Sequence, residues 1–261
     1  MASRVPLLTF HSLDDAGSPI STAPAAFRVQ MRVLRDRGFQ GVALREVLDA
    51  WDGLAELPPR PLALTFDDAF RNVREVAAPA LHELGFRATI FAVADYCGRT
   101  NAWPGQPPGV PILPLLSHAE LRVLAAAGFE IGSHGVTHAR LDRLSATAAE
   151  QEIAGSKRRL EDGLGQAVTA FAYPYGRADA FVRRCAAAQY RAACSDELRT
   201  AASGDDRHWL GRLDMYYFRG RLPLRLLGTA WGDGYVGSRR LGRRARAAAG
   251  DLAHALRFDR S

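Results

Sequence analysis

The sequence predicts an α/β fold, a single domain built as a distorted (β/α)7-like barrel with a basic C-terminal tail. Apolar runs typical of strands alternate with helical patterns about six or seven times, and parallel neighbouring strands need connections of this length. Polar side chains follow several of the predicted strands directly. Because catalytic groups collect at the carboxyl ends of barrel strands, this arrangement favours a barrel with one working face. A doubly wound open sheet is the alternative.

In the first half of the chain, short runs rich in branched or aromatic side chains predict strands over residues 5–10, 42–44, 62–66 and 86–93. Apolar residues at helical spacing predict helices over residues 22–38, 47–51 and 76–84. Pro79 is tolerated in the last of these only near a helix start or at a kink. Residues 95–114 are expected to form a loop.

The second half continues the alternation. Ser117 with Glu120 forms a capping box, and Leu116 with Leu121 a hydrophobic staple, so a helix is expected from there to Gly128. Further strands are predicted over residues 129–133, 168–173 and 190–195. Further helices are predicted over residues 145–164 and 179–188. The phosphate-binding loop pattern GxxxxGK[ST] is absent.

The composition is that of an ordinary globular enzyme, with 48% hydrophobic and 24% charged residues among 261. The amino terminus lacks the apolar segment of a secretory signal, so we expect a cytoplasmic protein, a leader already removed being the alternative. Cys97, Cys185 and Cys194 form no CxxC pair. We expect buried thiols, with a Cys185–Cys194 bridge left open.

Positive charge gathers near the C-terminus. Residues 219–261 carry ten Arg against three Asp, a net of +7, while the whole chain carries +6. We therefore divide the chain into a main domain, residues 1–218, and an Arg-rich helical extension, residues 219–261. The simplest interpretation of the extension is a solvated helix, and peripheral contact with anionic lipid headgroups is the alternative. No nucleic-acid partner is expected, because the basic stretch lacks interleaved aromatic residues.

Two motifs bring together candidate metal ligands. Asp67 and Asp68 follow a predicted strand directly, and two adjacent carboxylates become tolerable when one of them ligates a cation. His134 and His138 follow another strand, and on a helical turn this spacing puts both rings on one face. Asp68 and the two His would form a facial set with positions open for water and substrate. Each motif alone is more often an ordinary turn or an incidental pair of histidines.

Three segments resemble the successive motifs of the polysaccharide deacetylase family, also known as the NodB homology domain or carbohydrate esterase family 4. They are residues 65–68 (TFDD), 133–138 (SHGVTH) and 171–176 (FAYPYG). The resemblance implies a distorted (β/α) barrel and metal-dependent hydrolysis of N-acetyl groups on the amino sugars of a glycan or a lipid-linked saccharide.

The resemblance also implies roles for individual residues. Asp68, His134 and His138 would hold a divalent metal, usually zinc. Asp67 would be the general base, and the backbone N–H of Tyr175 would stabilise the oxyanion.

Two positions depart from the family pattern. An Arg that pairs with the catalytic base is common two residues before the motif's Pro, but this chain has Ala172 there, so the motif leaves unexplained what orients Asp67. The family's late Leu-x-His motif, which bears an acid His, is matched only by the letters of residues 252–254 in the tail.

His11 is the preferred candidate for the general acid, because it ends the first predicted strand and family members place a His at this site. A substrate contact or a packing role is the alternative. Trp103, in the long loop, is a candidate for stacking on a sugar ring or for covering the barrel end. Arg212 is interpreted as solvated surface charge, in preference to a contact with an anionic substrate.

The leading functional hypothesis is therefore an N-deacetylase of N-acetylhexosamine-containing glycans or glycolipids. A second hypothesis keeps the metal but changes the amide to a formyl group or a cyclic amide. A third is a catalytically silent carbohydrate-binding module, which Ala172 and the missing late motif would explain.

Overall fold

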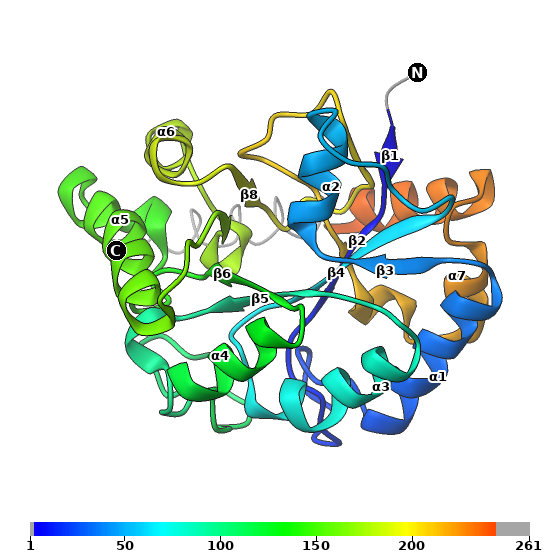
Figure 1. Ribbon diagram of the computed structural model, residues 1–261, viewed down its shortest axis with the longest axis horizontal. Helices are drawn as coiled ribbons and strands as arrows, with labels where there is room; N and C mark the ends of the chain where they lie inside the picture. Colours follow the sequence, from blue (N-terminus) through cyan, green and yellow to red (C-terminus); the bar gives the residue numbers. More distant parts are fainter. Residues whose placement is uncertain (1–2, 244–261) are drawn as a thin grey trace, which may run out of the picture.

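The computed structural model describes residues 3–243, and residues 1–2 and 244–261 lie outside the described part. Its main feature is a parallel sheet curled into an incomplete barrel with helices around the outside (Figure 1). In spatial order the strands are β10 (Leu213–Asp214), β2 (Leu7–Phe10), β4 (Pro61–Phe66), β5 (Thr89–Ala92), β6 (Glu130–Ser133), β7 (Ala170–Ala172) and β8 (Ala192–Cys194). A further strand, β3 (Gln40–Val42), pairs with the beginning of β4. The predicted (β/α)7-like barrel is confirmed.

The helices follow the predicted order: α1 (Pro24–Asp36), α2 (Leu44–Trp51), α3 (Ala78–Glu83), α4 (His118–Ala126), α5 (Ala146–Leu164), α6 (Ala180–Gln189) and α7 (Arg221–Leu226). The capping box of Ser117 and Glu120 begins α4 as expected. A π-helical turn, Val73–Ala77, precedes α3, and Pro79 lies in the first turn of that helix, where its missing N–H costs least.

Several elements are a few residues shorter than predicted, and one boundary also changes the type of structure. The strand expected over residues 42–44 ends at Val42, and Leu44 begins α2. The carboxylate of Glu46 accepts a hydrogen bond from the Ala43 backbone N–H at 2.8 Å, which satisfies a donor at the helix start. Leu44 is buried as the first residue of α2, and a strand residue at this position would be apolar as well. Its apolar character therefore does not distinguish a strand from a helix.

The main core lies between the sheet and the helices. The apolar stripe of α1 packs on the outer face of β2 and β4, where the Phe27 ring lies 5.2 Å from that of Phe10 and 5.9 Å from that of Phe66. A smaller core cluster includes inward-facing strand residues, among them Leu7, Ala63, Ala172 and Phe91. Gly132 is required beside Phe91, since a Cβ there would lie 2.5 Å from the ring.

The gap between β8 and β2 is spanned by one short segment. Leu210 forms a parallel bridge with Cys194 of β8, and four residues later Asp214 pairs with Thr9 of β2. Arg212 lies between these two contacts. The closure of the barrel therefore fixes the position of Arg212.

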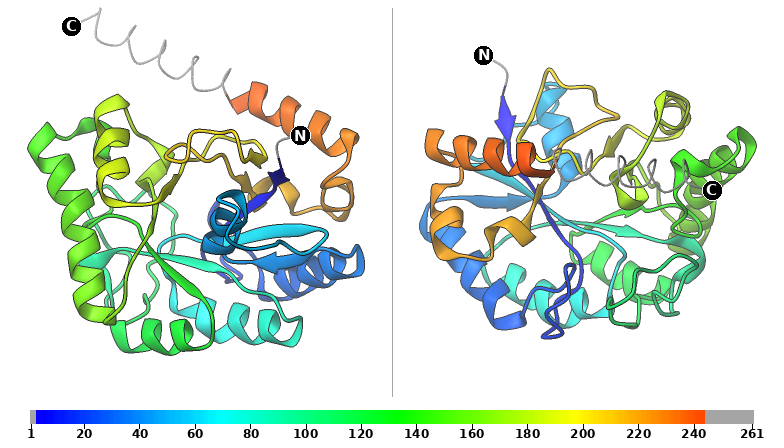
Figure 2. Two further views of the ribbon diagram at one scale, coloured as in Figure 1. Left: turned by 45° about the horizontal axis from the view of Figure 1, so that its top comes forward. Right: turned by 180° about the vertical axis from the view of Figure 1, so that it is seen from behind.

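The described part of the C-terminal extension packs on the barrel. Leu224, Leu227 and Val236 belong to the main core. Residues 230–243 are helical and lie beside β1 (Arg4–Val5), where Arg4 pairs with Asp233 at 3.0 Å (Figure 2). The boundary at residue 218 and the membrane contact of the tail stay predictions, and the Leu-x-His letters at residues 252–254 lie outside the described residues.

The cysteines and the helices bear on two further expectations from the sequence. All three cysteines are free, so the Cys185–Cys194 bridge is not formed; Cys194 is buried, and Cys97 and Cys185 are half-buried. Within residues 3–243, none of the helices combines the length and the apolar character needed to cross a bilayer.

Candidate active site and metal centre

The alternation of side chains along the strands directs the candidate residues into the barrel. Successive strand residues point to opposite faces of a sheet, so every second residue shares a face. In β4, Leu64 and Phe66 pack in the outer core, whereas Ala63 lies in the interior core. The next residues of the inward series are Thr65 and Asp67. His11 continues the inward series of β2 in the same way.

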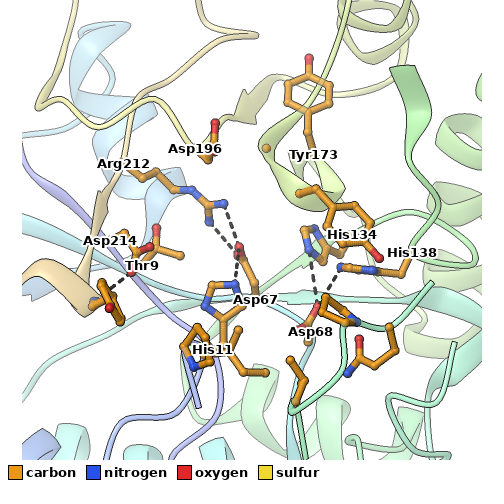
Figure 3. Close-up of a pocket in the computed structure, with 18 of the residues that line it drawn as sticks. Thr9, His11, Asp67, Asp68, His134, His138, Tyr173, Asp196, Arg212 and Asp214 are labelled. Carbon is orange, nitrogen blue, oxygen red and sulfur yellow. Dashed lines mark hydrogen bonds and ion pairs between the residues drawn. The ribbon is translucent and has the colours of Figure 1, made fainter. Parts of the chain in front are cut away.

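These side chains line one cavity of about 420 Å³, a volume usual for a small-molecule site. Figure 3 shows the candidate carboxylates and imidazoles gathered there from the ends of different strands. The cavity contains every site residue expected from the sequence: His11, Asp67, Asp68, His134, His138 and Tyr175. The sequence-based expectation that they lie on one working face agrees with this arrangement.

Asp68, His134 and His138 form a group suited to a metal ion. Asp68 Oδ1 lies 3.6 Å from His134 Nε2 and 3.3 Å from His138 Nε2, and the three ligand atoms lie within 4.8 Å of one another. All three residues are buried, and Asp68 Oδ1 has no hydrogen-bond partner among residues 3–243. A buried carboxylate oxygen without a donor is costly, and a cation bound between it and the imidazoles would remove that cost.

The tautomer of His134 also fits metal binding. Its Nδ1 donates a hydrogen bond to the carbonyl oxygen of Ala172 at 2.8 Å, which leaves the Nε2 lone pair facing Asp68. Burial lowers the pKa of His134 to about 4, so the ring is neutral near pH 7. A neutral imidazole held by a backbone carbonyl is the usual form of a metal-ligating histidine.

His138 reaches the site by a different route from the one expected. Residues 134–138 are not a helical turn; after β6 the chain turns at Gly135 and enters the left-handed region again at His138, with φ of 84° and 62°. Glu152 of α5 fixes this turn. Its Oε2 accepts hydrogen bonds from the N–H groups of Val136 at 2.9 Å and Thr137 at 3.0 Å, and its Oε1 accepts from the Thr137 hydroxyl at 2.7 Å.

The site concentrates unusual backbone conformations. Among residues 3–243, the non-glycine residues with positive φ are Asp68, Ala69, His138 and Tyr175. Such conformations are uncommon for residues with a Cβ and persist where the surrounding structure fixes them. They lie at or beside the candidate ligands. The uncommon backbone conformations are therefore part of how the chain positions these side chains.

Trp103 packs on a candidate ligand. Its ring is stacked on that of His138 with centroids 4.2 Å apart, and it is only 3% exposed. Tyr175 contacts His138 as well, at 4.6 Å between centroids. Because Trp103 is already covered, its ring supports His138, and the expected stacking of Trp103 on a sugar finds no exposed face.

Arg212 corrects the sequence-based interpretation most clearly. It is 4% exposed, so it is not solvated surface charge. Its Nη1 and Nη2 donate to Oδ1 and Oδ2 of Asp67 at 2.7 and 2.8 Å, and its Nε donates to the Ser195 carbonyl at 3.0 Å. Arg212 therefore pairs with Asp67. The family pattern assigns this pairing to an Arg at the position where this chain has Ala172.

The charge of Arg212 controls the ionisation of Asp67. Burial alone would raise the pKa of Asp67, but the charge and hydrogen bonds of Arg212, together with the nearby His134 and His11, hold this pKa well below its usual range. Asp67 is therefore ionised at any physiological pH. On the other side, His11 Nε2 lies 3.8 Å from Asp67 Oδ2, with about a quarter of the His11 side chain exposed to the cavity.

The sequence matches a known family over most of this region. The family model described as polysaccharide deacetylase covers residues 55–193, more than half of the chain. The chain belongs to the polysaccharide deacetylase family. The resemblance inferred from the three motifs is thereby confirmed.

Two known proteins match part of this chain. YxkH of Bacillus subtilis (strain 168) is 25% identical over 175 residues, which are 67% of this chain and 58% of YxkH. A gellan lyase of Bacillus sp is 30% identical over 115 residues, 44% of this chain but 4% of the lyase. This chain thus spans less than two thirds of the length of either relative.

Solved structures confirm the fold. The Streptococcus pyogenes deacetylase PplD, in complex with acetate, superposes with a TM-score of 0.72 at 22% identity, over 82% of this chain and 93% of PplD. The Bacillus cereus polysaccharide deacetylase BC0361 gives a TM-score of 0.67 at 26% identity, over 82% of this chain and 65% of its own. The (β/α) barrel of this chain is therefore the one found in deacetylases.

Proposed function

We propose that this protein is a metal-dependent hydrolase that removes N-acetyl groups from a glycan or glycolipid containing N-acetylhexosamine. One observation carries the proposal: the two adjacent aspartates lie in one cavity, and each contacts a different set of side chains. Asp68 faces the Nε2 atoms of two imidazoles, while Asp67 is bound by Arg212 and faces His11. Membership of the polysaccharide deacetylase family supports the same chemistry.

The donor set fits a divalent cation, most simply Zn²⁺, which accepts two imidazoles and a carboxylate and keeps positions open. Bound there, such a cation supplies Lewis acidity toward water and toward the acetamide carbonyl. The chain itself supplies the proton transfers. Because Arg212 lowers the pKa of Asp67, this carboxylate is a weak base that stays ionised and oriented.

In the proposed reaction Asp67 accepts a proton from water, and the oxygen of that water forms a bond to the acetamide carbon. The Tyr175 backbone N–H donates to the developing oxyanion. The C–N bond then breaks, and His11 Nε2 gives a proton to the departing amine. The products are acetate and a free amino sugar.

The proposal is tested by acetate release from N-acetylglucosamine oligosaccharides. The protein is treated with a chelator and reloaded with Zn²⁺, and bound metal is counted. We expect activity to follow the metal, Asp67→Asn to abolish turnover while keeping the metal, and Asp68→Asn to lose both. Turnover that is unaffected by chelation or by Asp67→Asn would refute the mechanism.

The same assay separates the alternatives. Release of formate, or activity on small cyclic amides alone, would favour the second amidohydrolase hypothesis. Binding of oligosaccharide without release of any acyl group would favour a carbohydrate-binding module. We also propose that the protein is cytoplasmic and that its tail contacts the membrane surface. Flotation of the full chain and of residues 1–220 with anionic liposomes tests the membrane contact.

A further inference from the structure

A second cavity, of about 320 Å³, adjoins the candidate active site. Three arginines contribute to its wall together with two carboxylates and an indole: Arg177, Arg240, Arg243, Asp196, Glu197 and Trp209. Asp196 and Arg243 also line the active-site cavity. The two cavities therefore share a wall, and Figure 3 shows Asp196 at the edge of the active-site pocket on the side of Arg212.

The shared wall is tightly built. A Cβ on Gly176, whose φ is +64°, would lie 2.2 Å from Cβ and 2.3 Å from Cγ of Asp196, so the loops after β7 and β8 approach this closely only because residue 176 is glycine. Arg243 ties the C-terminal helix to the same point. Its Nη1 donates to the Asp196 carbonyl at 3.0 Å, and its Nη2 pairs with the Asp196 carboxylate.

The carboxylates of this cavity are matched by nearby donors. Asp196 pairs with Arg243. Glu197 accepts from Arg199 Nε and from Trp209 Nε1, each at 3.2 Å. The negative charge in the wall is therefore already engaged.

Two arginines remain as surplus positive charge. Arg240 and Arg177 pair with no carboxylate among residues 3–243, and Arg240 Nε is buried without a hydrogen-bond partner. A buried N–H donor without an acceptor is costly, so the arrangement calls for an anionic acceptor inside the cavity. Guanidinium groups present paired N–H donors that match the oxygens of carboxylates and phosphates.

We infer that this cavity binds an anionic group, a carboxylate or phosphate, carried by the saccharide whose acetamide reaches Asp67 and the Asp68 group. The inference rests on the proposed function and narrows its substrate class to acidic N-acetylated glycans. Arg212 does not provide this recognition, because both of its terminal nitrogens bind Asp67. The anion is bound by Arg177 and Arg240 on the far side of the Asp196 wall.

The test compares acetate release from three oligosaccharides: a neutral N-acetylglucosamine oligomer, an oligomer alternating N-acetylglucosamine with glucuronic acid, and the neutral oligomer carrying one phosphate. The variants are Arg240→Gln and Arg177→Gln. Arg239→Gln is the matched control, since Arg239 is exposed on the same helix, carries the same charge and packs on the Tyr235 ring at 5.1 Å, outside the cavity.

We expect both cavity variants to lower kcat/KM for at least one acidic substrate by roughly tenfold or more, mainly through KM, because a charge-assisted hydrogen bond is lost. Turnover of the neutral oligomer should change less than about twofold, as should all activities of Arg239→Gln. The acidic substrate that suffers the larger loss identifies carboxylate or phosphate as the bound group. If Arg240→Gln fails to fold, Arg177→Gln still decides, because Arg177 is exposed.

A binding measurement separates this inference from the proposed function. The affinity of the acidic oligomers is measured on the Asp67→Asn background with Arg177→Gln, Arg240→Gln or Arg239→Gln added. Weaker binding by the Arg177→Gln and Arg240→Gln proteins, with unchanged binding by the Arg239→Gln protein, supports the anion site. This conclusion holds even if no substrate releases acetate, because the absence of acetate release would contradict only the proposed function. Equal affinities in all three proteins, or equal turnover of acidic substrates by the cavity variants and the control, would overturn the inference.

Discussion

Arg212 donates two hydrogen bonds to the carboxylate of Asp67, at 2.7 and 2.8 Å, although 145 residues separate them in the chain. Both side chains are almost fully buried. The pair explains how a chain with Ala172 in its third family motif still orients its candidate base. It also means that the short segment closing the barrel between β8 and β2 contributes directly to the site.

Replacing Arg212 with Gln should affect both stability and turnover. The substitution leaves the Asp67 carboxylate buried without its cation, and breaking a buried pair in this way costs about 3–5 kcal/mol of unfolding free energy. The pKa of Asp67 should rise, so the acidic limb of the rate profile should move to higher pH. Denaturant unfolding and a pH–rate profile measure the two effects.

The control for this prediction is Arg207→Gln, which removes an Arg from the same segment that pairs with Asp52 at the surface. The unfolding free energy and the pH–rate profile of the Arg207→Gln protein should match those of the wild type. An Arg212→Gln protein with an unshifted acidic limb would show that this arginine does not govern Asp67.

Replacing Glu152 with Ala should weaken metal binding without touching a ligand. Glu152 accepts hydrogen bonds from both Val136 and Thr137, and these bonds fix the turn that returns His138 to the site. Loss of residues that orient ligands typically weakens metal affinity 10- to 100-fold. Competition with a chromogenic chelator measures the change. Glu150→Ala, on an exposed position of the same helix, is the control, and equal metal affinity in both variants would contradict the prediction.

Replacing His11 with Ala should lower turnover much more than metal content. His11 lies 3.8 Å from Asp67 and is not among the candidate ligands. Loss of a general acid commonly costs a factor of roughly 100 or more in rate. Acetate release and bound metal are measured on the same preparation. A parallel loss of both would assign His11 to the structure of the site.

The stability of the metal-free protein should fall as the pH is lowered from about 6.5 to 4. The unfolded chain protonates His134 near its ordinary pKa of 6.5, whereas burial lowers the pKa of the folded residue to about 4. Between these values the unfolded state binds the additional proton, so lowering the pH favours unfolding, by about 3 kcal/mol across the window for this residue.

Urea unfolding in the presence of a chelator, at several pH values, measures this dependence. His134→Asn should show a shallower slope than the wild type. His82→Asn, at an exposed helix position, should keep the wild-type slope. Identical slopes in all three proteins would show that His134 is not the residue responsible.

The sequence by itself determined the barrel and the candidate ligand set. The alternation of apolar runs gave the order of strands and helices, and most predicted elements form close to their expected bounds. Asp67, Asp68 and His134 follow strands directly, so the two-residue period and the parallel direction of the strands carry them to one end of the barrel. These are local rules, and local sequence is sufficient to apply them.

The tertiary structure decided which residues support that set. Arg212, Glu152 and Trp103 come from a closing segment, a helix and a long loop, and no short motif links them to Asp67 or His138. A charged residue in a loop is usually solvated, and only closure of the barrel buries Arg212 against a carboxylate. Contacts between distant segments depend on how the whole sheet curls, and a reading of neighbouring residues does not contain that information.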